Sequence, residues 1–197
     1  MFQIRIHGRG GQGVVTAAEM LSVAAFEEGR HAQAIPSFGS ERMGAPVVAY
    51  VRIDDDPIEI TEPVLQPDLL IVQDPTLFHA VDVFSGLAND GFLLINSARR
   101  LPELHIDDAL ARLPDHHVYT VAATELAMRH LGRATPNTAL LGAFTALFEM
   151  LHIESVVKAI NDKFSGDIAQ SNVVVARAAH DAARVDRDGR KADAATD

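Results

Sequence analysis

Cysteine is absent from this chain of 197 residues. Without a thiol, the chain forms no disulfide, offers no cysteine nucleophile and holds no iron–sulfur cluster through thiolates of its own. Basic charge is also scarce, because 27 acidic residues outnumber 17 lysines and arginines and give a formal net charge of −10. A charge of that sign argues against general nucleic-acid binding.

Long apolar runs and targeting segments are lacking as well. No apolar run is long enough to span a bilayer, and charged and polar residues interrupt the N-terminus at once, so no signal peptide is visible. We therefore expect no membrane span and a cytoplasmic location. The length suits one domain, which we expect at residues 1–183, followed by a charged, frayed tail at 184–197.

Signatures of catalysis are few. The nine histidines form no H-x-H or H-E-x-x-H arrangement, and His116 and His117 are adjacent and would project oppositely from a strand. The sequence contains no serine elbow, no P-loop lysine and no evident pair of catalytic carboxylates. The consecutive carboxylates Asp54, Asp55 and Asp56 favour a solvated turn over a metal site. We therefore expect no metal site and no catalytic residue in this chain.

The most informative stretch is a glycine turn between an expected strand and an expected helix. Residues 2–7 alternate in the manner of a strand, and residues 14–21 have apolar side chains at helical spacing. Between them, Gly8-Arg-Gly-Gly-Gln-Gly13 permits a turn too tight for residues with a Cβ. This order predicts an α/β domain of the Rossmann-like, doubly wound type, with a mostly parallel sheet and flanking helices.

Two interpretations of the glycine turn remain open. The N–H groups at the helix start, with Arg9 beside them, form a candidate anion site. Alternatively, the glycines only let the helix pack close to the strand. A dinucleotide site would also need an acidic residue about 20 positions onward, and residues 29–36 contain none, so we expect no NAD binding.

The rest of the chain predicts further elements. We expect strands at 31–35, 47–53, 67–73, 92–96 and 116–121, with 58–60 pairing back as a hairpin, and helices at 122–131, 137–151, 154–164 and 168–183. The helix at 137–151 carries one charge, Glu149, so it must be buried on every side, which indicates cover by another subunit. We expect Asp74 to cap a short helix after its strand, with a ligand contact as the alternative.

Four segments together resemble the gamma subunit, or gamma domain, of the 2-oxoacid:ferredoxin oxidoreductases, of the pyruvate:ferredoxin oxidoreductase (pyruvate synthase) type. Residues 4–18 are similar to its G-x-G-G-Q-G-V-V-T-A signature, and residues 36–47 to its P-S-F/Y-G-x-E-x-R/M-G-x-P-V loop. Residues 70–75 and 91–97 resemble its buried strands, and residues 137–143 its N-T-A-x-L-G-A helix start. The resemblance covers nearly the whole chain apart from its C-terminal end.

The resemblance implies a subunit of a hetero-oligomer, a dimer of protomers, that is not catalytic alone and holds no cofactor by itself. Its partners would be thiamine-binding alpha- and beta-type subunits and a ferredoxin-like iron–sulfur subunit, holding thiamine diphosphate, Mg²⁺ and 4Fe–4S clusters. The complex would convert a 2-oxoacid such as pyruvate to its acyl-coenzyme A and pass electrons to ferredoxin or another acceptor. The gamma chain would contribute assembly, active-site cover and contacts to coenzyme A.

The motifs and the resemblance define one candidate set of cofactor-binding residues: Arg9, Gly10, Gly11, Gln12, Gly13, Ser37, Arg42, Asn137 and Thr138. The N–H groups of the glycine turn, with Arg9, suit a pyrophosphate, and Arg42 suits a bidentate contact to a phosphate or carboxylate. The helix start at Asn137 and Thr138 offers another anion position. The alternative is that these two residues only cap the helix.

Two alternative functions stay open at this level. The same subunit role in a phenylglyoxylate (aryl-2-oxoacid) or 2-oxoglutarate enzyme is compatible with the motifs, because the acyl pocket should lie mostly on other chains. The alternative from a different class is a stand-alone nucleotide- or CoA-binding module. Such a module should not need the apolar helix at 138–151.

Overall fold

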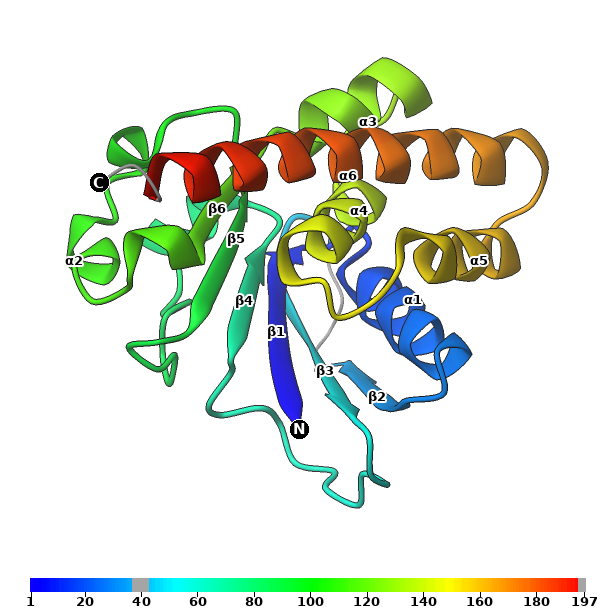
Figure 1. Cartoon of the computed structure of the whole chain (residues 1–197), viewed down its shortest axis with the longest axis horizontal. Coiled ribbons are helices and arrows are strands. Elements are labelled where there is room, and N and C mark those ends of the chain that lie inside the picture. The colour runs from blue at the N-terminus through cyan, green and yellow to red at the C-terminus, as the bar shows by residue number, and fades with distance from the viewer. Residues whose placement is uncertain (37–42, 195–197) are drawn as a thin grey trace.

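A mixed six-stranded sheet forms the centre of the chain in a computed structural model that describes residues 1–36 and 43–194 (Figure 1). The strands are β1 Phe2–Arg9, β2 His31–Pro36, β3 Pro46–Asp54, β4 Leu69–Val72, β5 Phe92–Asn96 and β6 Val118–Val121. The α-helices are α1 Val14–Glu27, α2 Asp107–Leu110, α3 Ala123–Leu131, α4 Asn137–Phe148, α5 Ile153–Lys163 and α6 Gly166–Ala194. Short 3-10 helices are η1 Pro75–His79, η2 Leu101–Leu104 and η3 Asp115–His117.

The sheet order is β2-β3-β1-β4-β5-β6. β1, β4, β5 and β6 run parallel, in registers that pair Ile4 with Leu69 and Leu69 with Phe92. β3 is antiparallel to both β1 and β2, so the edge beyond β1 is an antiparallel pair. The expected α/β class with a mostly parallel sheet is confirmed, and the antiparallel edge makes the sheet mixed.

Successive residues of the parallel strands enter two cores on opposite faces of the sheet. Leu69 and Ile71 of β4 join the larger apolar cluster, which contains the buried residues of α1, α4 and α6. Leu70 and Val72 join the smaller cluster, with Leu77 of η1 among its members. The chain after β1 therefore turns to the larger cluster, and the chain after β4 turns to the opposite face. Figure 1 shows α1 and α5 on one side of the sheet and α2 on the other.

Helix α4 is buried by its own chain. Residues 137–147 are all buried in the single chain, and α4 packs against α6, α1, α3 and α5. Gly142 permits the closest approach, since a Cβ there would overlap the carbonyl oxygen of Ala176 in α6. The prediction that another subunit must cover this helix is therefore wrong. The helix does not discriminate between a complex subunit and a stand-alone module.

The C-terminal helix and the predicted hairpin also differ from expectation. α6 continues to Ala194, where the sequence predicted a helix end at 183. The Arg187 guanidinium holds this extension, because it donates to the carbonyl oxygen of Ala146 at 2.6 Å and pairs with Glu149 at 2.7 Å. Residues 58–60 form no strand. Within the described residues, no helix is long and apolar enough to cross a bilayer.

Candidate functional site

The glycine turn places the uncapped start of α1 at the carboxyl end of β1. Gly13 is the N-cap residue with φ of 74°, and Gly11 has φ of 93°, so both adopt the left-handed conformation that favours glycine. Among the described residues, no side chain makes a capping hydrogen bond to α1. The first N–H groups of an α-helix have no partner within the helix, so this end can receive an anion.

Arg9 and Gln12 tie the turn to the end of β4. The Arg9 guanidinium donates to Thr76 Oγ1 at 2.8 Å and to the Gly44 carbonyl oxygen at 3.0 Å, and its Nε lies 3.2 Å from Asp74 Oδ2. Gln12 donates from Nε2 to Asp74 Oδ2 at 3.0 Å and accepts the Arg9 N–H at 2.8 Å. These contacts give both side chains a structural role. A ligand contact by either one stays a prediction.

Asp74 is the acceptor on which these contacts converge. Its Oδ1 accepts the N–H and the hydroxyl of Thr76 at 3.0 and 2.6 Å, which confirms the expected cap of η1. Partial burial alone would raise the pKa of Asp74. Hydrogen bonds from Thr76 and Gln12 and the charge of Arg9 outweigh burial, so the pKa lies below its usual value and the carboxylate stays ionised.

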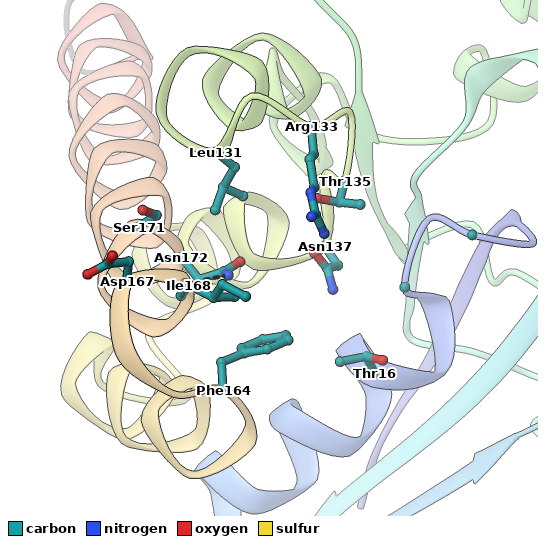
Figure 2. Close-up of a pocket in the computed structure, with 12 residues that line it drawn as sticks. Thr16, Leu131, Arg133, Thr135, Asn137, Phe164, Asp167, Ile168, Ser171 and Asn172 are labelled. Atoms are coloured by element: carbon teal, nitrogen blue, oxygen red, sulfur yellow. Dashed lines mark hydrogen bonds between the residues drawn. The ribbon is translucent and has the colours of Figure 1, made fainter.

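A cavity of about 360 Å³ lies where the starts of α1, α4 and α6 converge (Figure 2). Gly13 and Thr16 contribute from α1, and Asp167 and Asn172 contribute from α6. Asn137 contributes from the first residue of α4. Converging helix N-termini give the cavity a positive electrostatic character, because each macrodipole has its positive end there.

Asn137 is a largely buried polar residue that lines this cavity. Only 5% of its surface is accessible, and within the described residues its side chain makes no hydrogen bond. A Cβ on Gly13 would lie 2.5 Å from Asn137 Nδ2, so the amide stands directly against the start of α1. Figure 2 shows Asn137 and Arg133 pointing into the same cavity. The Asn137 amide therefore has hydrogen-bonding capacity that a ligand in the cavity would use.

Thr138 has a supporting position behind the cavity. It is fully buried, and its hydroxyl donates to Asn172 Oδ1 at 3.0 Å. Asn172 in turn donates to the Ile168 carbonyl oxygen at 2.8 Å, which fixes the side chain that lines the cavity. Pro136 is the N-cap residue of α4, and no side chain in the described part of the chain caps that helix, so the capping alternative for Asn137 and Thr138 is wrong.

The remaining lining residues supply one cation and an apolar wall. Arg133 lies between α3 and α4 and, within the described residues, makes no ion pair. Leu131, Phe164 and Ile168 line the cavity with apolar surface. A site that combines phosphate-binding N–H groups, a guanidinium and an aromatic face suits a phosphorylated ligand with a flat ring. Asp167 is the acidic lining residue and would disfavour phosphate at its end of the cavity.

The cavity brings together part of the predicted set and adds residues that the sequence did not indicate. Gly11, Gly13 and Asn137 line it, whereas Arg9, Gly10 and Gln12 do not. Ser37 and Arg42 lie outside the described residues. Sequence reasoning missed a further group: Thr16, Arg133, Phe164 and Asn172. They come from four separate segments, and the one local signal was an arginine shortly before the Thr135-Pro136 helix start.

Metal binding has no candidate centre in the described part of the chain, where no three His, Asp or Glu side chains are grouped to hold an ion.

Comparisons with known proteins agree in sequence and in structure. Residues 3–182 match the family model described as pyruvate ferredoxin/flavodoxin oxidoreductase. Pyruvate synthase subunit PorC of Methanothermobacter marburgensis is 44% identical over 181 residues, covering 92% of this chain and 97% of that protein. Pyruvate/ketoisovalerate oxidoreductases common subunit gamma of Pyrococcus abyssi is 44% identical over 185 residues, covering 94% and 98%. The crystal structure of pyruvate oxidoreductase subunit PORC from Thermotoga maritima has a TM-score of 0.76 at 33% identity, covering 91% of this chain and 95% of that chain.

Proposed function

The chain belongs to the pyruvate ferredoxin/flavodoxin oxidoreductase family, and we propose that it acts as the gamma subunit of a 2-oxoacid oxidoreductase complex of that family. Relatives named as subunits of such enzymes align with it over nearly their whole length. Alignment over that length supports the proposal that this chain, like those relatives, is a separate subunit. The common gamma subunit of P. abyssi is named for both pyruvate and ketoisovalerate enzymes. We therefore assign the substrate of the complex only to the class of 2-oxoacids, with pyruvate as the first substrate to test.

Redox chemistry belongs to the partner subunits in this proposal. The chain has no cysteine, so thiolate-ligated iron–sulfur clusters need other chains. We assign thiamine diphosphate, Mg²⁺ and the clusters to thiamine-binding and ferredoxin-like subunits of a cytoplasmic hetero-oligomer, arranged as a dimer of protomers. Co-expression with those partners should give a complex that oxidises pyruvate with coenzyme A. Omission of this chain should abolish that activity, and full activity without it would contradict the proposal.

We propose coenzyme A as the ligand of this cavity, and the observation that carries this assignment is Asn137, which is 5% exposed, makes no side-chain hydrogen bond to a described residue and stands beside the start of α1, which no described side chain caps. N–H groups of that start and Asn137 Nδ2 would donate to the pyrophosphate oxygens. Arg133 would add a cation, and Phe164 would face the adenine ring. The cavity of about 360 Å³ holds only the nucleotide end, which leaves the thiol arm free to reach a partner subunit.

The chain's part in the reaction is then positioning of the acyl acceptor. Holding the nucleotide end of coenzyme A restricts where its thiol can move, which raises the effective concentration of the thiol at the active site of the partner subunit. Cover of that site by this chain would also exclude water from the reacting groups. Neither effect requires an acid, base or nucleophile on this chain.

Asn137→Asp tests the coenzyme A assignment in the assembled enzyme. The change keeps the side-chain shape but replaces a donor with a negative charge that faces the pyrophosphate. Loss of one hydrogen bond to a charged group is worth about 1.5–3 kcal/mol, so the apparent KM for coenzyme A should rise about tenfold or more. The KM for the 2-oxoacid and the subunit composition should not change.

The matched control is Asn161→Asp, which adds the same charge on the exposed surface of α5, away from the cavity. It should leave the KM for coenzyme A unchanged. An unaltered KM in Asn137→Asp, with the complex intact, would refute the coenzyme A role of the cavity while leaving the subunit assignment in place.

A further inference from the structure

A second cavity, of about 560 Å³, lies at the carboxyl ends of β4, β5 and β6 and is not used by the proposed function. Its walls are η1 after β4, the turn after β5, η2 and the start of α3. No residue that the structure describes lines both cavities. The second cavity is therefore a separate feature of the fold.

The topology explains why a cavity opens there. After β5 the chain turns to the smaller apolar cluster, which contains Leu104 of η2. After the neighbouring strand β6 it turns to the larger cluster, which contains Ala123 of α3. Adjacent parallel strands whose connections leave to opposite faces create a crevice at their carboxyl ends, and open α/β sheets bind ligands in such crevices.

The same divergence occurs between β1 and β4, with a different outcome. There, the contacts of Gln12 and Arg9 with Asp74 and Thr76 bridge the two strand ends. Between β5 and β6 a smaller bridge, the hydrogen-bonded pair Asn96 and Thr124, joins the two strand ends, and both residues line the crevice that stays open beside them.

The floor of the open crevice is rigid. Asn96 is 8% exposed, and its Nδ2 donates to the Gln73 carbonyl oxygen at 2.7 Å and to Thr124 Oγ1 at 2.8 Å. Its Oδ1 accepts the Thr124 N–H at 3.0 Å. The nearly buried Ser97 accepts the Arg99 N–H at 2.9 Å, which fixes the turn that carries the Arg99 side chain. A preformed floor of this kind lowers the entropic cost of binding a ligand.

A guanidinium, two carboxylates and two imidazoles line the crevice without an ion-pair partner among the described residues. Arg99 and the imidazoles of His79 and His105 line it from three different segments, and Glu103 and Glu125 line it as well. Within the described residues, none of these five side chains makes an ion pair or a hydrogen bond through its charged or ring atoms. A guanidinium suits a carboxylate, and carboxylates suit an ammonium group.

We propose that this crevice binds a small organic acid that also carries an ammonium group, which is the chemistry of a free α-amino acid. Arg99 takes the carboxylate in a bidentate contact, and Glu103 and Glu125 take the ammonium group. The two imidazoles are available for the remaining polar atoms.

Titration of the ¹⁵N-labelled full chain, followed by NMR, tests the site with glycine and acetate at constant ionic strength. Glycine should shift the amide signals of Arg99 and Glu125 and should bind about tenfold more tightly than acetate, because acetate lacks the ammonium group. Signals of Gly11 and Gly13 in the first cavity should not move. Equal effects of glycine and acetate, or shifts confined to the first cavity, would overturn the proposal.

Variants separate the two ends of the ligand. Arg99→Gln should abolish the shifts by both probes, whereas Arg100→Gln, which changes the neighbouring arginine outside the cavity lining, should bind like the unmodified chain. The double variant Glu103→Gln/Glu125→Gln tests the other end independently and should reduce glycine binding to the level of acetate. Unchanged glycine binding in Arg99→Gln or in the double variant would count against the site.

Discussion

Asp74→Asn should destabilise the protein because Asp74 holds the glycine turn to the end of β4. The substitution keeps an acceptor for the Thr76 cap but places an NH₂ group where Oδ2 stood. That group would face two donors, Gln12 Nε2 and Arg9 Nε, which lie 3.0 and 3.2 Å from Oδ2. Two attractive contacts thereby become donor–donor contacts.

The expected magnitude follows from these two contacts. A hydrogen bond to a charged group contributes about 1.5–3 kcal/mol, and partial exposure of Arg9 reduces its share. We expect the free energy of unfolding to fall by about 2 kcal/mol. In a chain of this size that corresponds to a decrease in Tm of about 4–8 °C.

Urea unfolding as a function of pH provides the assay and a check on the cause. The pKa of Asp74 lies below 3.8 in the folded chain, so its ionised form stabilises the fold at and above that pH. The stability difference between the wild type and Asp74→Asn should be constant near neutral pH. It should narrow as the pH falls below 3.8 toward the folded-state pKa, because the carboxylate then takes up a proton.

Asp90→Asn is the matched control, because Asp90 is exposed and its side chain makes no hydrogen bond or ion pair within the described residues. Its unfolding free energy should stay within about 0.5 kcal/mol of the wild type. If Asp74→Asn is as stable as this control at neutral pH, the account of the turn is wrong.

Three further predictions concern the packing of the helices and the interior. Gly142→Ala should lower the free energy of unfolding, measured with urea, by about 3 kcal/mol or more because the new methyl group meets the backbone of α6. Gly189→Ala is the control: it has open space around it and should leave the free energy of unfolding unchanged or raise it. Arg187→Ala should lower the free energy of unfolding by about 1–2 kcal/mol and speed proteolysis after residue 183, because it removes the contact with the C-terminal end of α4. An unchanged free energy of unfolding would show that this contact is unimportant. Burial and the charge of Arg5 lower the pKa of His7 to about 4 from 6.5. The unfolded chain therefore binds the proton more readily, and stability should fall by about 3 kcal/mol from pH 6.5 to pH 4. His7→Gln should remove that fall, and a persisting fall would assign it to other groups.

The sequence by itself determined the local conformations and the family. β-Branched and apolar runs predicted the strands at 92–96 and 116–121, the second of which begins at Val118 in the structure, because a buried parallel strand needs side chains that are apolar on both faces. The glycines at 11 and 13 predicted the turn because few other residues adopt φ near 74–93° without strain. The motifs around these positions were sufficient for the resemblance that the comparisons confirm.

Tertiary structure alone decided what covers each face and what meets in each cavity. The apolar helix α4 needed a cover, but its pattern could not say that α6 of the same chain provides it. Arg9 is adjacent to the glycine turn in the sequence, but its guanidinium contacts Asp74 and Thr76 and does not line the cavity at the helix start. Asn137 joins Gly13 only because α4 packs beside α1. A local sequence pattern reflects the preference of a residue for burial or for a backbone conformation. The residues that it contacts come from segments far away along the chain, and only tertiary packing brings those segments together.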